Sequence, residues 1–151
     1  MLYNVSYRIV KNEFDAQDMV HDAIIKAFQT ISNTPCDLNL GPWLKRIVIN
    51  CSLDHLRQRK KLGWLKEPFE FSEFEDEQVT YQDITLKVEH IKEGIYDLKD
   101  KYRIILVLYL IEDYSHREIA AQLGLKEGTV RNQYIRGKRL LKQRLQNVTA
   151  L

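Results

Sequence analysis

The chain has 151 residues, a formal net charge of +2 and a hydrophobic share of 44%. That length suits one ordinary domain or two small ones, and that composition can fill a core, which excludes collagenous, low-complexity and wholly disordered chains. The longest apolar run, 104–111, is far shorter than the roughly 20 residues needed to cross a bilayer, so it predicts a buried helix. Only six glycines and three prolines occur, which favours long helices.

The first residues, 1–7, lack the basic start and long apolar stretch of a secretory signal. We therefore expect a cytoplasmic protein without membrane insertion. Its two cysteines, Cys36 and Cys51, have neither the number nor the spacing of a disulfide framework or a zinc finger. We expect no metal and no cofactor.

The small net charge hides a sorted distribution. Residues 45–66 hold seven Lys and Arg against one Asp, residues 67–83 hold seven acidic residues and no basic one, and residues 126–144 hold seven bases against one Glu. Local fields of this kind act on nearby polyanions even when the whole chain is almost neutral. Two basic segments separated by an acidic stretch predict two surfaces for nucleic acid.

In the first half of the chain, apolar residues recur at helical spacing over 15–31, and Asp15 stands where an N-cap would. Pro35 follows the end of that helix, and Pro42 suits the first turn of the next, which runs to Leu56. Residues 63–78 show no clear period and include a proline, which predicts a linker. We expect two domains, 1–61 and 82–151, joined by an acidic linker at 62–81.

Four helices are predicted after the linker. An apolar stripe marks the first, at Ile84, Val88, Ile91 and Ile95, and residues 102–111 form the second. Ser115 can cap a third helix through Leu123, with Glu118 at the reciprocal position of a capping box. Gly124 permits a tight turn, after which residues 126–145 form the fourth helix. No strand pair with turn chemistry occurs, so the predicted fold class is all-α, with two small helical domains.

Residues 116–135 have the spacing of a helix-turn-helix, in which Ala120 allows close approach, Gly124 accepts the turn and Val130 fills the wedge. The second helix then has an apolar packing face and a polar outer face. Arg and Asn match guanine and adenine edges in a major groove, and Ile can touch a thymine methyl. A plain αα-hairpin with a solvated basic face is the alternative. The candidate DNA contacts are Lys126, Thr129, Arg131, Asn132, Ile135, Arg136 and Arg139.

Four blocks carry a family resemblance, namely residues 15–23, 43–50, 114–120 and 127–131. In this order, and over nearly the whole chain, they resemble the extracytoplasmic-function group of bacterial RNA polymerase sigma factors. Unrelated helix-turn-helix proteins would share only the last two blocks. The resemblance implies a promoter-melting domain at 1–61 and a second domain at 82–151 that reads the upstream (−35) promoter element.

The resemblance also implies site residues. The helix matching 15–28 would bind core RNA polymerase, with candidates Asp18, His21, Asp22 and Lys26. A metal site there is disfavoured, because no other His or Cys completes it. The segment 43–60 would meet the downstream (−10) element: Asn50 would hold a flipped base, Trp43 would be a core anchor or a stacking wedge, and the backbone contacts would be Arg46, Arg57, Arg59 and Lys60.

The implied partners are core RNA polymerase, promoter DNA and an anti-sigma factor. The acidic stretch resembles the family's linker in the RNA exit path, although a solvated tether fits it equally well. Two departures are notable. The family has another helix before the residues matching 1–10, so we expect uncovered apolar surface at Ile24, Phe28 and Ile47, and His21 stands where Gln is usual.

Three function classes compete. The first is a sigma factor that directs RNA polymerase to promoters, recognising the −35 element and melting the −10 element. The second is a stand-alone helix-turn-helix regulator whose N-terminal part dimerises. The third, an enzyme, is disfavoured, because no nucleophile–base motif is recognisable and Gly128 lies in no phosphate-cradling loop.

Overall fold

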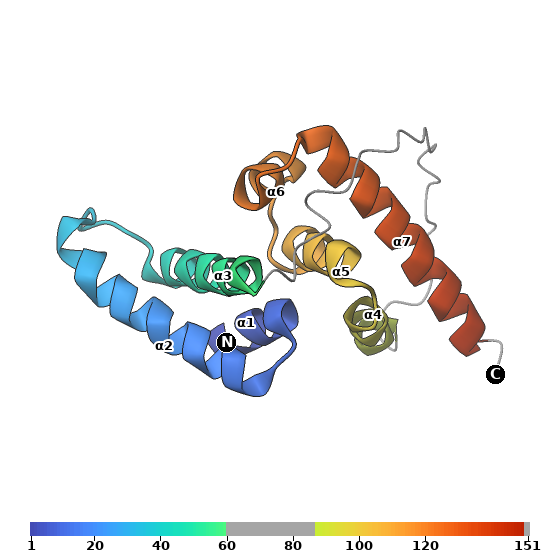
Figure 1. The fold of residues 1–151 in the computed structure, drawn as a ribbon, viewed down its shortest axis with the longest axis horizontal. Coiled ribbons are helices and arrows are strands. Elements are labelled where there is room, and N and C mark those ends of the chain that lie inside the picture. The colour runs from blue at the N-terminus through green and yellow to red at the C-terminus, as the bar shows by residue number, and fades with distance from the viewer. Residues whose placement is uncertain (60–86, 150–151) are drawn as a thin grey trace. The chain divides into compact units, whose positions relative to one another are not determined.

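The computed structural model describes residues 1–59 and 87–149, and every regular element in these two ranges is helical (Figure 1). The chain divides into two compact units, residues 1–63 and 64–151, and each is described by itself. The expected all-α fold with two domains is confirmed. The predicted linker at 62–81 and the candidate DNA contact Lys60 lie outside the described residues.

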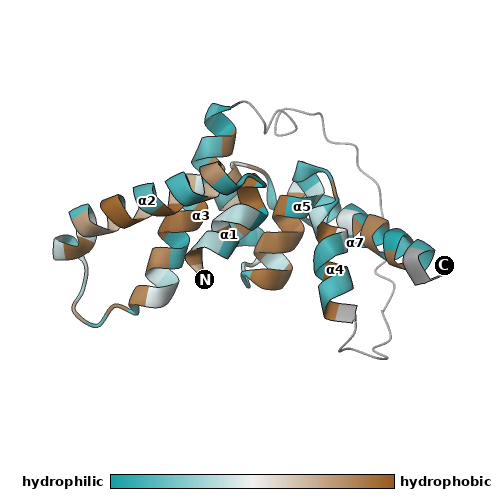
Figure 2. Ribbon diagram, turned by 90° about the horizontal axis from the view of Figure 1, so that it is seen from below, coloured by the Kyte–Doolittle hydropathy of each residue, from teal (hydrophilic) through white to brown (hydrophobic). Residues whose placement is uncertain are grey.

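Unit 1 consists of three helices that all pack on one another: α1 (Leu2–Val10), α2 (Glu13–Thr30) and α3 (Leu40–Gln58). A short 3₁₀ turn, η1 (Ile31–Asn33), follows α2. Hydrophobic and hydrophilic residues alternate along α2 (Figure 2), as in an amphipathic helix with one face on a core. The side chains that fill this core include Val5, Ile9, Ala16, Met19, Ala23, Val48, Ile49, Leu53 and Leu56.

The start of α2 corrects one prediction. Asp15 is not the N-cap: Asn12, in extended backbone, caps the helix, and its side-chain oxygen accepts the Asp15 N–H at 3.0 Å. Lys11, at φ 56, closes α1 with a bond from its N–H to the Tyr7 carbonyl. Since α1 fixes where the chain turns, α2 begins two residues before the predicted start, and the Asp15 side chain is available for other contacts.

Unit 2 contains α4 (Lys87–Tyr96), α5 (Asp100–Leu106), a π-helical segment η3 (Val107–Ile111), α6 (His116–Leu123) and α7 (Glu127–Thr149). A core of Ile95, Leu98, Leu106, Val107 and Leu141 lies between α4, α5, η3 and α7. A Cβ on Gly137 would lie 3.2 Å from the Leu106 side chain and 3.3 Å from that of Tyr102. Glycine therefore allows α5 and α7 to pack closely.

The run 104–111 is not one buried α-helix. Regular α-helix ends at Leu106, and Val107–Ile111 continues with wider π turns. Residues 104–108 are buried, whereas Leu110 is 48% exposed. The apolar character of the run predicted burial. Hydrophobicity alone does not show where the helix changes from α to π turns, and this change rotates the later side chains away from the core.

Candidate nucleic-acid interface

The helix-turn-helix of unit 2 has the packing that its sequence spacing predicts. Ile119, Ala120 and Leu123 of α6 are buried, and so is Val130 of α7. Gly124 ends α6 at φ 66, the left-handed region that favours glycine, and the Leu125 N–H donates to the Ala120 carbonyl at 2.9 Å. The turn is therefore built from backbone bonds, and it fixes α7 against α6.

Beyond the turn, α7 has two different faces. Val130, Gly137 and Leu141 are buried on the packing face. At 100° per residue, the opposite face holds Asn132 and Arg136, half-buried, and Arg139, exposed, with Ile135 beside them. Thr129 and Arg131 lie nearer the edges, and Lys126 immediately precedes the helix. All seven predicted upstream contacts thus lie within residues 126–139, at the start and on the outer side of α7.

Arg131 has a partner within its own helix. Its guanidinium donates to Glu127 Oε1 at 3.0 Å, and the Arg131 side chain is 60% exposed. Exposed pairs of this kind contribute about 0–1 kcal/mol, so a phosphate can displace Glu127 at small cost.

An aromatic cluster supports the start of the helix-turn-helix, and the sequence patterns did not reveal it. His116, the first residue of α6, stacks on Tyr109 of η3 with ring centroids 4.4 Å apart and meets the edge of Tyr134 of α7 at 4.9 Å. Burial lowers the pKa of His116, the Arg131 charge lowers it further, and Glu127 acts in the opposite direction. Three elements thus meet at one imidazole.

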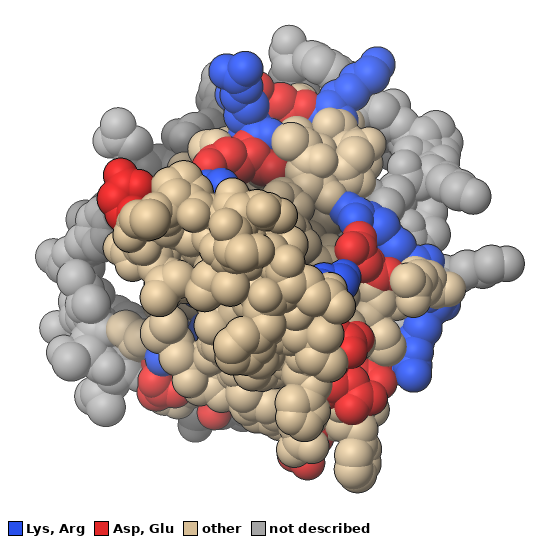
Figure 3. Space-filling model, turned by 90° about the vertical axis from the view of Figure 1, so that its left-hand side faces the viewer, with Lys and Arg blue, Asp and Glu red and all other residues tan. Residues whose placement is uncertain are grey.

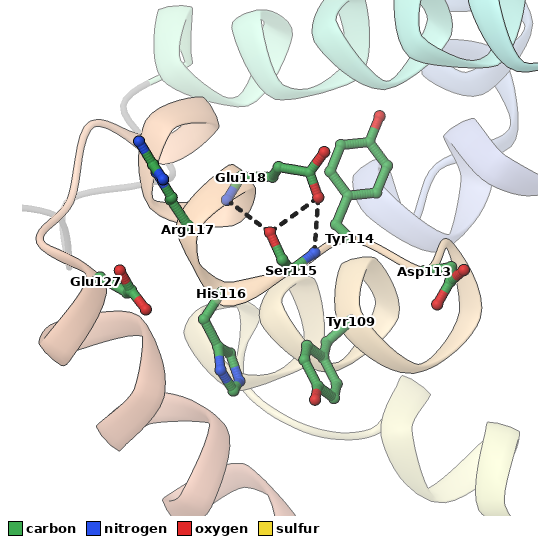
Figure 4. Close-up of a pocket in the computed structure, with 8 residues that line it drawn as sticks. All are labelled: Tyr109, Asp113, Tyr114, Ser115, His116, Arg117, Glu118 and Glu127. Carbon is green, nitrogen blue, oxygen red and sulfur yellow. Dashed lines mark hydrogen bonds between the residues drawn. The ribbon is translucent and has the colours of Figure 1, made fainter.

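An open hollow of about 470 Å³ lies beside this cluster, at the start of α6 (Figure 4). The predicted capping box is confirmed there: Ser115 Oγ accepts the Glu118 N–H at 3.2 Å, and Glu118 Oε2 accepts the Ser115 N–H at 2.9 Å. Glu118 is thus occupied by the helix cap.

Four of the six downstream candidates lie within α3 of unit 1; Arg59 is the C-cap of this helix, and Lys60 is outside the described residues. At 100° per residue, Trp43, Arg46, Asn50 and Arg57 fall within about 60° of one another on a single face. Arg46, Asn50 and Arg57 are exposed, and Trp43 is half-buried. Arg57 donates to Asp54 at 2.6 Å within this helix. These four side chains share one face of the helix, which we call the α3 face.

Arg59 does not belong to the α3 face. It is the C-cap residue of α3, lies about 160° from Trp43 on the helical wheel, and donates to Asp15 Oδ2 at 3.1 Å. Asp15 itself is 8% exposed. The family resemblance implied a backbone contact for Arg59; in the structure its guanidinium hydrogen-bonds Asp15, on the side of α3 away from the α3 face.

The polymerase-binding candidates are all on α2. Asp18, His21, Asp22 and Lys26 are exposed and lie within about 140° of one another around the helix. Lys26 also reaches α3: burial raises the pKa of the Cys51 thiol, and the Lys26 ammonium, which hydrogen-bonds it, acts in the opposite direction. In the described ranges no group of three His, Cys, Asp or Glu side chains is arranged to hold a metal ion.

Apolar side chains are exposed at the end of unit 1 where α2 and α3 are joined. Of the three residues expected to be uncovered, Phe28 is 74% exposed, while Ile24 and Ile47 are half-buried. Three more exposed apolar residues lie on α2, η1 and the start of α3, namely Ile25, Ile31 and Leu40. Figure 3 looks onto this end, and the centre of the view is free of charged side chains.

Comparison with known protein families assigns both units. The model described as Sigma-70 region 2 matches residues 1–62, and the model described as Sigma-70, region 4 matches residues 95–141. The first match contains α1, α2 and α3, and the second contains the helix-turn-helix. No described helix is long and apolar enough to cross a membrane.

Individual relatives agree with these matches. The chain is 28% identical to the ECF RNA polymerase sigma factor SigW of Bacillus subtilis, over 97% of this chain and 84% of that protein. It is 34% identical to the ECF RNA polymerase sigma factor SigE of Mycolicibacterium smegmatis, over 95% of this chain and 57% of that protein.

A solved structure has the same fold. It is the sigma factor RpoE of Bartonella quintana, crystallised in complex with the anti-sigma factor NepR, with a TM-score of 0.60 and 20% identity over 96% of this chain and 89% of that one. With regions 2 and 4 in order on one chain, the protein belongs to the extracytoplasmic-function group of the sigma-70 family of RNA polymerase sigma factors.

Proposed function

We propose that this sigma factor uses its two units on two separate promoter elements, with α7 reading the −35 element as duplex and the α3 face binding the −10 element as it melts. The observation that supports the proposal is the pair of polar faces, one on each unit, each of which carries Arg and Asn side chains. Arg and Asn are suited to bind phosphates and base edges. A stand-alone regulator needs only the helix-turn-helix, whereas a region 2 sequence occupies residues 1–62 of this chain.

On the −35 element, Asn132 and Arg136 are the proposed base contacts, because they lie opposite Val130 and Leu141 on α7. Arg can donate two hydrogen bonds to guanine, and Asn can pair with adenine, each in the major groove. Arg139 farther along this face, Thr129 and Arg131 nearer its edges, and Lys126 just before the helix are the proposed phosphate contacts. Ile135 is the proposed apolar contact to a thymine methyl.

On the −10 element, opening the duplex requires that exposed phosphates be neutralised and that an unstacked base be held. Arg46 and Arg57 supply positive charge on either side of Asn50 along the α3 face. The Asn50 amide can donate and accept hydrogen bonds at a base edge. Half-buried Trp43 lies at the N-terminal end of the α3 face and offers a ring on which a base can stack.

The outer side of α2 is the proposed polymerase surface. Asp18 and Asp22 supply negative charge, His21 lies beside them, and Lys26 is one turn farther along. This surface belongs to a different helix from the α3 face, so the proposed polymerase and DNA contacts share no residue.

An anti-sigma factor is a further proposed partner. The solved RpoE chain was crystallised with one, and exposed apolar residues such as Phe28 and Leu40 supply contact area here. We also place the protein in the cytoplasm, where RNA polymerase acts, and assign it a binding role without catalysis of its own.

The test uses holoenzyme reconstituted from core RNA polymerase and the full chain. A promoter is first selected from a random-sequence library, and permanganate then detects unpaired thymines in the downstream element. Asn50→Ala should lower the fraction of bound promoter that is open, while leaving binding of the upstream duplex unchanged. Asn132→Ala should weaken binding of the upstream duplex, while leaving the open fraction of the promoter that is still bound unchanged. Equal effects of both variants on both elements would contradict the division of labour.

A further inference from the structure

A buried carboxylate ties the start of α2 to the end of α3. Arg59 donates to Asp15 Oδ2 at 3.1 Å, and His55 Nε2 lies 3.2 Å from the same oxygen, in a geometry that does not complete a hydrogen bond. The Asp15 and His55 side chains are 11% and 15% exposed, whereas that of Arg59 is 51% exposed. Asp15 is 44 residues from Arg59 in the chain, so the contact fixes two distant segments.

The energetics favour a pair that stays closed. Asp15 lies in the first turn of α2, where the helix dipole stabilises a carboxylate, and it is almost fully buried. Moving Arg59 away to a phosphate would leave a buried charge without its cationic partner, which costs far more than an exposed pair gains. The Asp15–Arg59 pair is therefore poorly suited to open each time DNA binds.

The pair acts on the last turn of α3. Arg59 is the C-cap, and its N–H donates to the His55 carbonyl at 3.1 Å. Helix ends fray, because their last carbonyls and side chains have few partners within the helix. Arg57 lies in this same turn, on the α3 face, about 160° around the helix from the Asp15 contact.

We propose that Asp15 and Arg59 are positioning residues, which hold the last turn of α3 closed so that Arg57 is presented to the melted −10 strand. Arg59 is then not itself a DNA contact. This inference rests on the proposed function of the α3 face. It adds that the Asp15–Arg59 pair, on the opposite side of the helix, holds that face in place.

The test is a double-mutant cycle of Asp15→Asn and Arg59→Gln in reconstituted holoenzyme. The probe is a fork-junction DNA, with a single-stranded downstream element, made from the promoter selected by the wild-type holoenzyme. Each single variant should weaken fork-DNA binding about tenfold, the size expected for loss of one charge-assisted contact, and the double variant should bind no more weakly than either single variant. Amides of the last turn of α3 should exchange faster in all three variants.

A direct role of Arg59 on phosphate makes the opposite prediction. Asp15→Asn would then remove a competing anion and add one net positive charge, so it would leave fork-DNA binding unchanged or strengthen it. That result would overturn the proposal. The proposal would also be overturned if the losses of fork-DNA binding free energy in Asp15→Asn and Arg59→Gln were additive in the double variant.

A control separates positioning from general stability. Ser6 and Ser52 share a buried hydrogen bond of 2.8 Å between α1 and α3, away from the last turn. Ser6→Ala should lower the melting temperature of unit 1 but leave fork-DNA binding unchanged well below that temperature. If Ser6→Ala weakens binding as much as Asp15→Asn, the proposal is wrong. Failure of the wild-type holoenzyme to bind fork DNA would instead contradict the proposed function, while amide exchange in the free chain would still test the support.

Discussion

The imidazole ring of His116 lies against the phenol ring of Tyr109, with centroids 4.4 Å apart and planes inclined by only 10°. Tyr134 of the recognition helix contacts both rings, and Lys138 lies 5.2 Å from the Tyr134 ring centroid. A titratable group therefore stands where the first helix of the helix-turn-helix, the recognition helix and the π-helical segment meet.

The pH dependence of unit 2 should follow from this position. Because burial and Arg131 lower the pKa of His116 below its ordinary 6.5, the folded unit binds the proton less tightly than the unfolded chain does. The stability contribution of neutral His116 is complete above pH 6.5 and decreases as the pH falls below that value. Thermal unfolding between pH 8 and pH 5 should show this loss, and His116→Phe should reduce it. If His90→Gln, at an exposed histidine of the same unit, removes the loss of stability at low pH and His116→Phe does not, the assignment of this loss to His116 is wrong.

Base reading should depend on the outer face of α7. Asn132→Ala and Arg136→Ala should each remove roughly 1–3 kcal/mol of discrimination at one upstream base pair, since each removes a bidentate contact. The measurement is competition binding between the selected −35 duplex and its single-base variants. Arg144→Ala is the matched control for Arg136→Ala, because this exposed residue pairs with Asp97 at 3.3 Å and its loss changes the net charge by the same amount. Retained specificity in both face variants would show that another surface reads the bases.

Polymerase binding should depend on the outer side of α2. Asp22→Lys reverses an exposed charge there and should weaken capture of core RNA polymerase about tenfold, through like-charge repulsion, while DNA binding by unit 2 is unchanged. Asp37→Lys makes the same charge change at an exposed loop position of unit 1 and serves as the control. Equal loss of capture in both variants would indicate a general charge effect and remove the assignment to α2.

The same substitution should have opposite effects at two glycines of the helix-turn-helix. Gly124 has φ 66, so Gly124→Ala should destabilise unit 2 by about 1–2 kcal/mol. Gly128 lies in the first turn of α7 with no atom within 4 Å of an added Cβ, so Gly128→Ala should stabilise the unit by up to about 1 kcal/mol. Chemical denaturation measures both, and a stabilising Gly124→Ala would contradict the turn geometry.

Local signals in the sequence were enough to predict the helix-turn-helix. The Ser115 cap, the Gly124 turn and the Val130 wedge each depend on residues within one or two turns, and the structure contains all three. The all-α class followed in the same way, from apolar spacing along single helices.

Contacts between distant segments were not predictable from those signals. Periodicity did not reveal α1. The Tyr7 carbonyl accepts the bond that ends α1, and Asn12 caps α2, so these two residues determine where α2 begins. It also did not join Tyr109, His116 and Tyr134, which come from three elements. The family resemblance named Arg59 as a backbone contact, and no local pattern showed that its guanidinium bonds to Asp15, a carboxylate 44 residues away.

The most direct test of the central claim is run-off transcription from the selected promoter with core RNA polymerase, with and without the full chain. If the chain acts as a sigma factor, core enzyme alone should give no specific transcript, and core enzyme with the chain should give one defined transcript. Both α3-face and α7-face variants should reduce that transcript. The core enzyme is first shown to be active with another sigma factor. If the chain then binds the promoter DNA but this core enzyme makes no transcript, the assignment to promoter opening is contradicted.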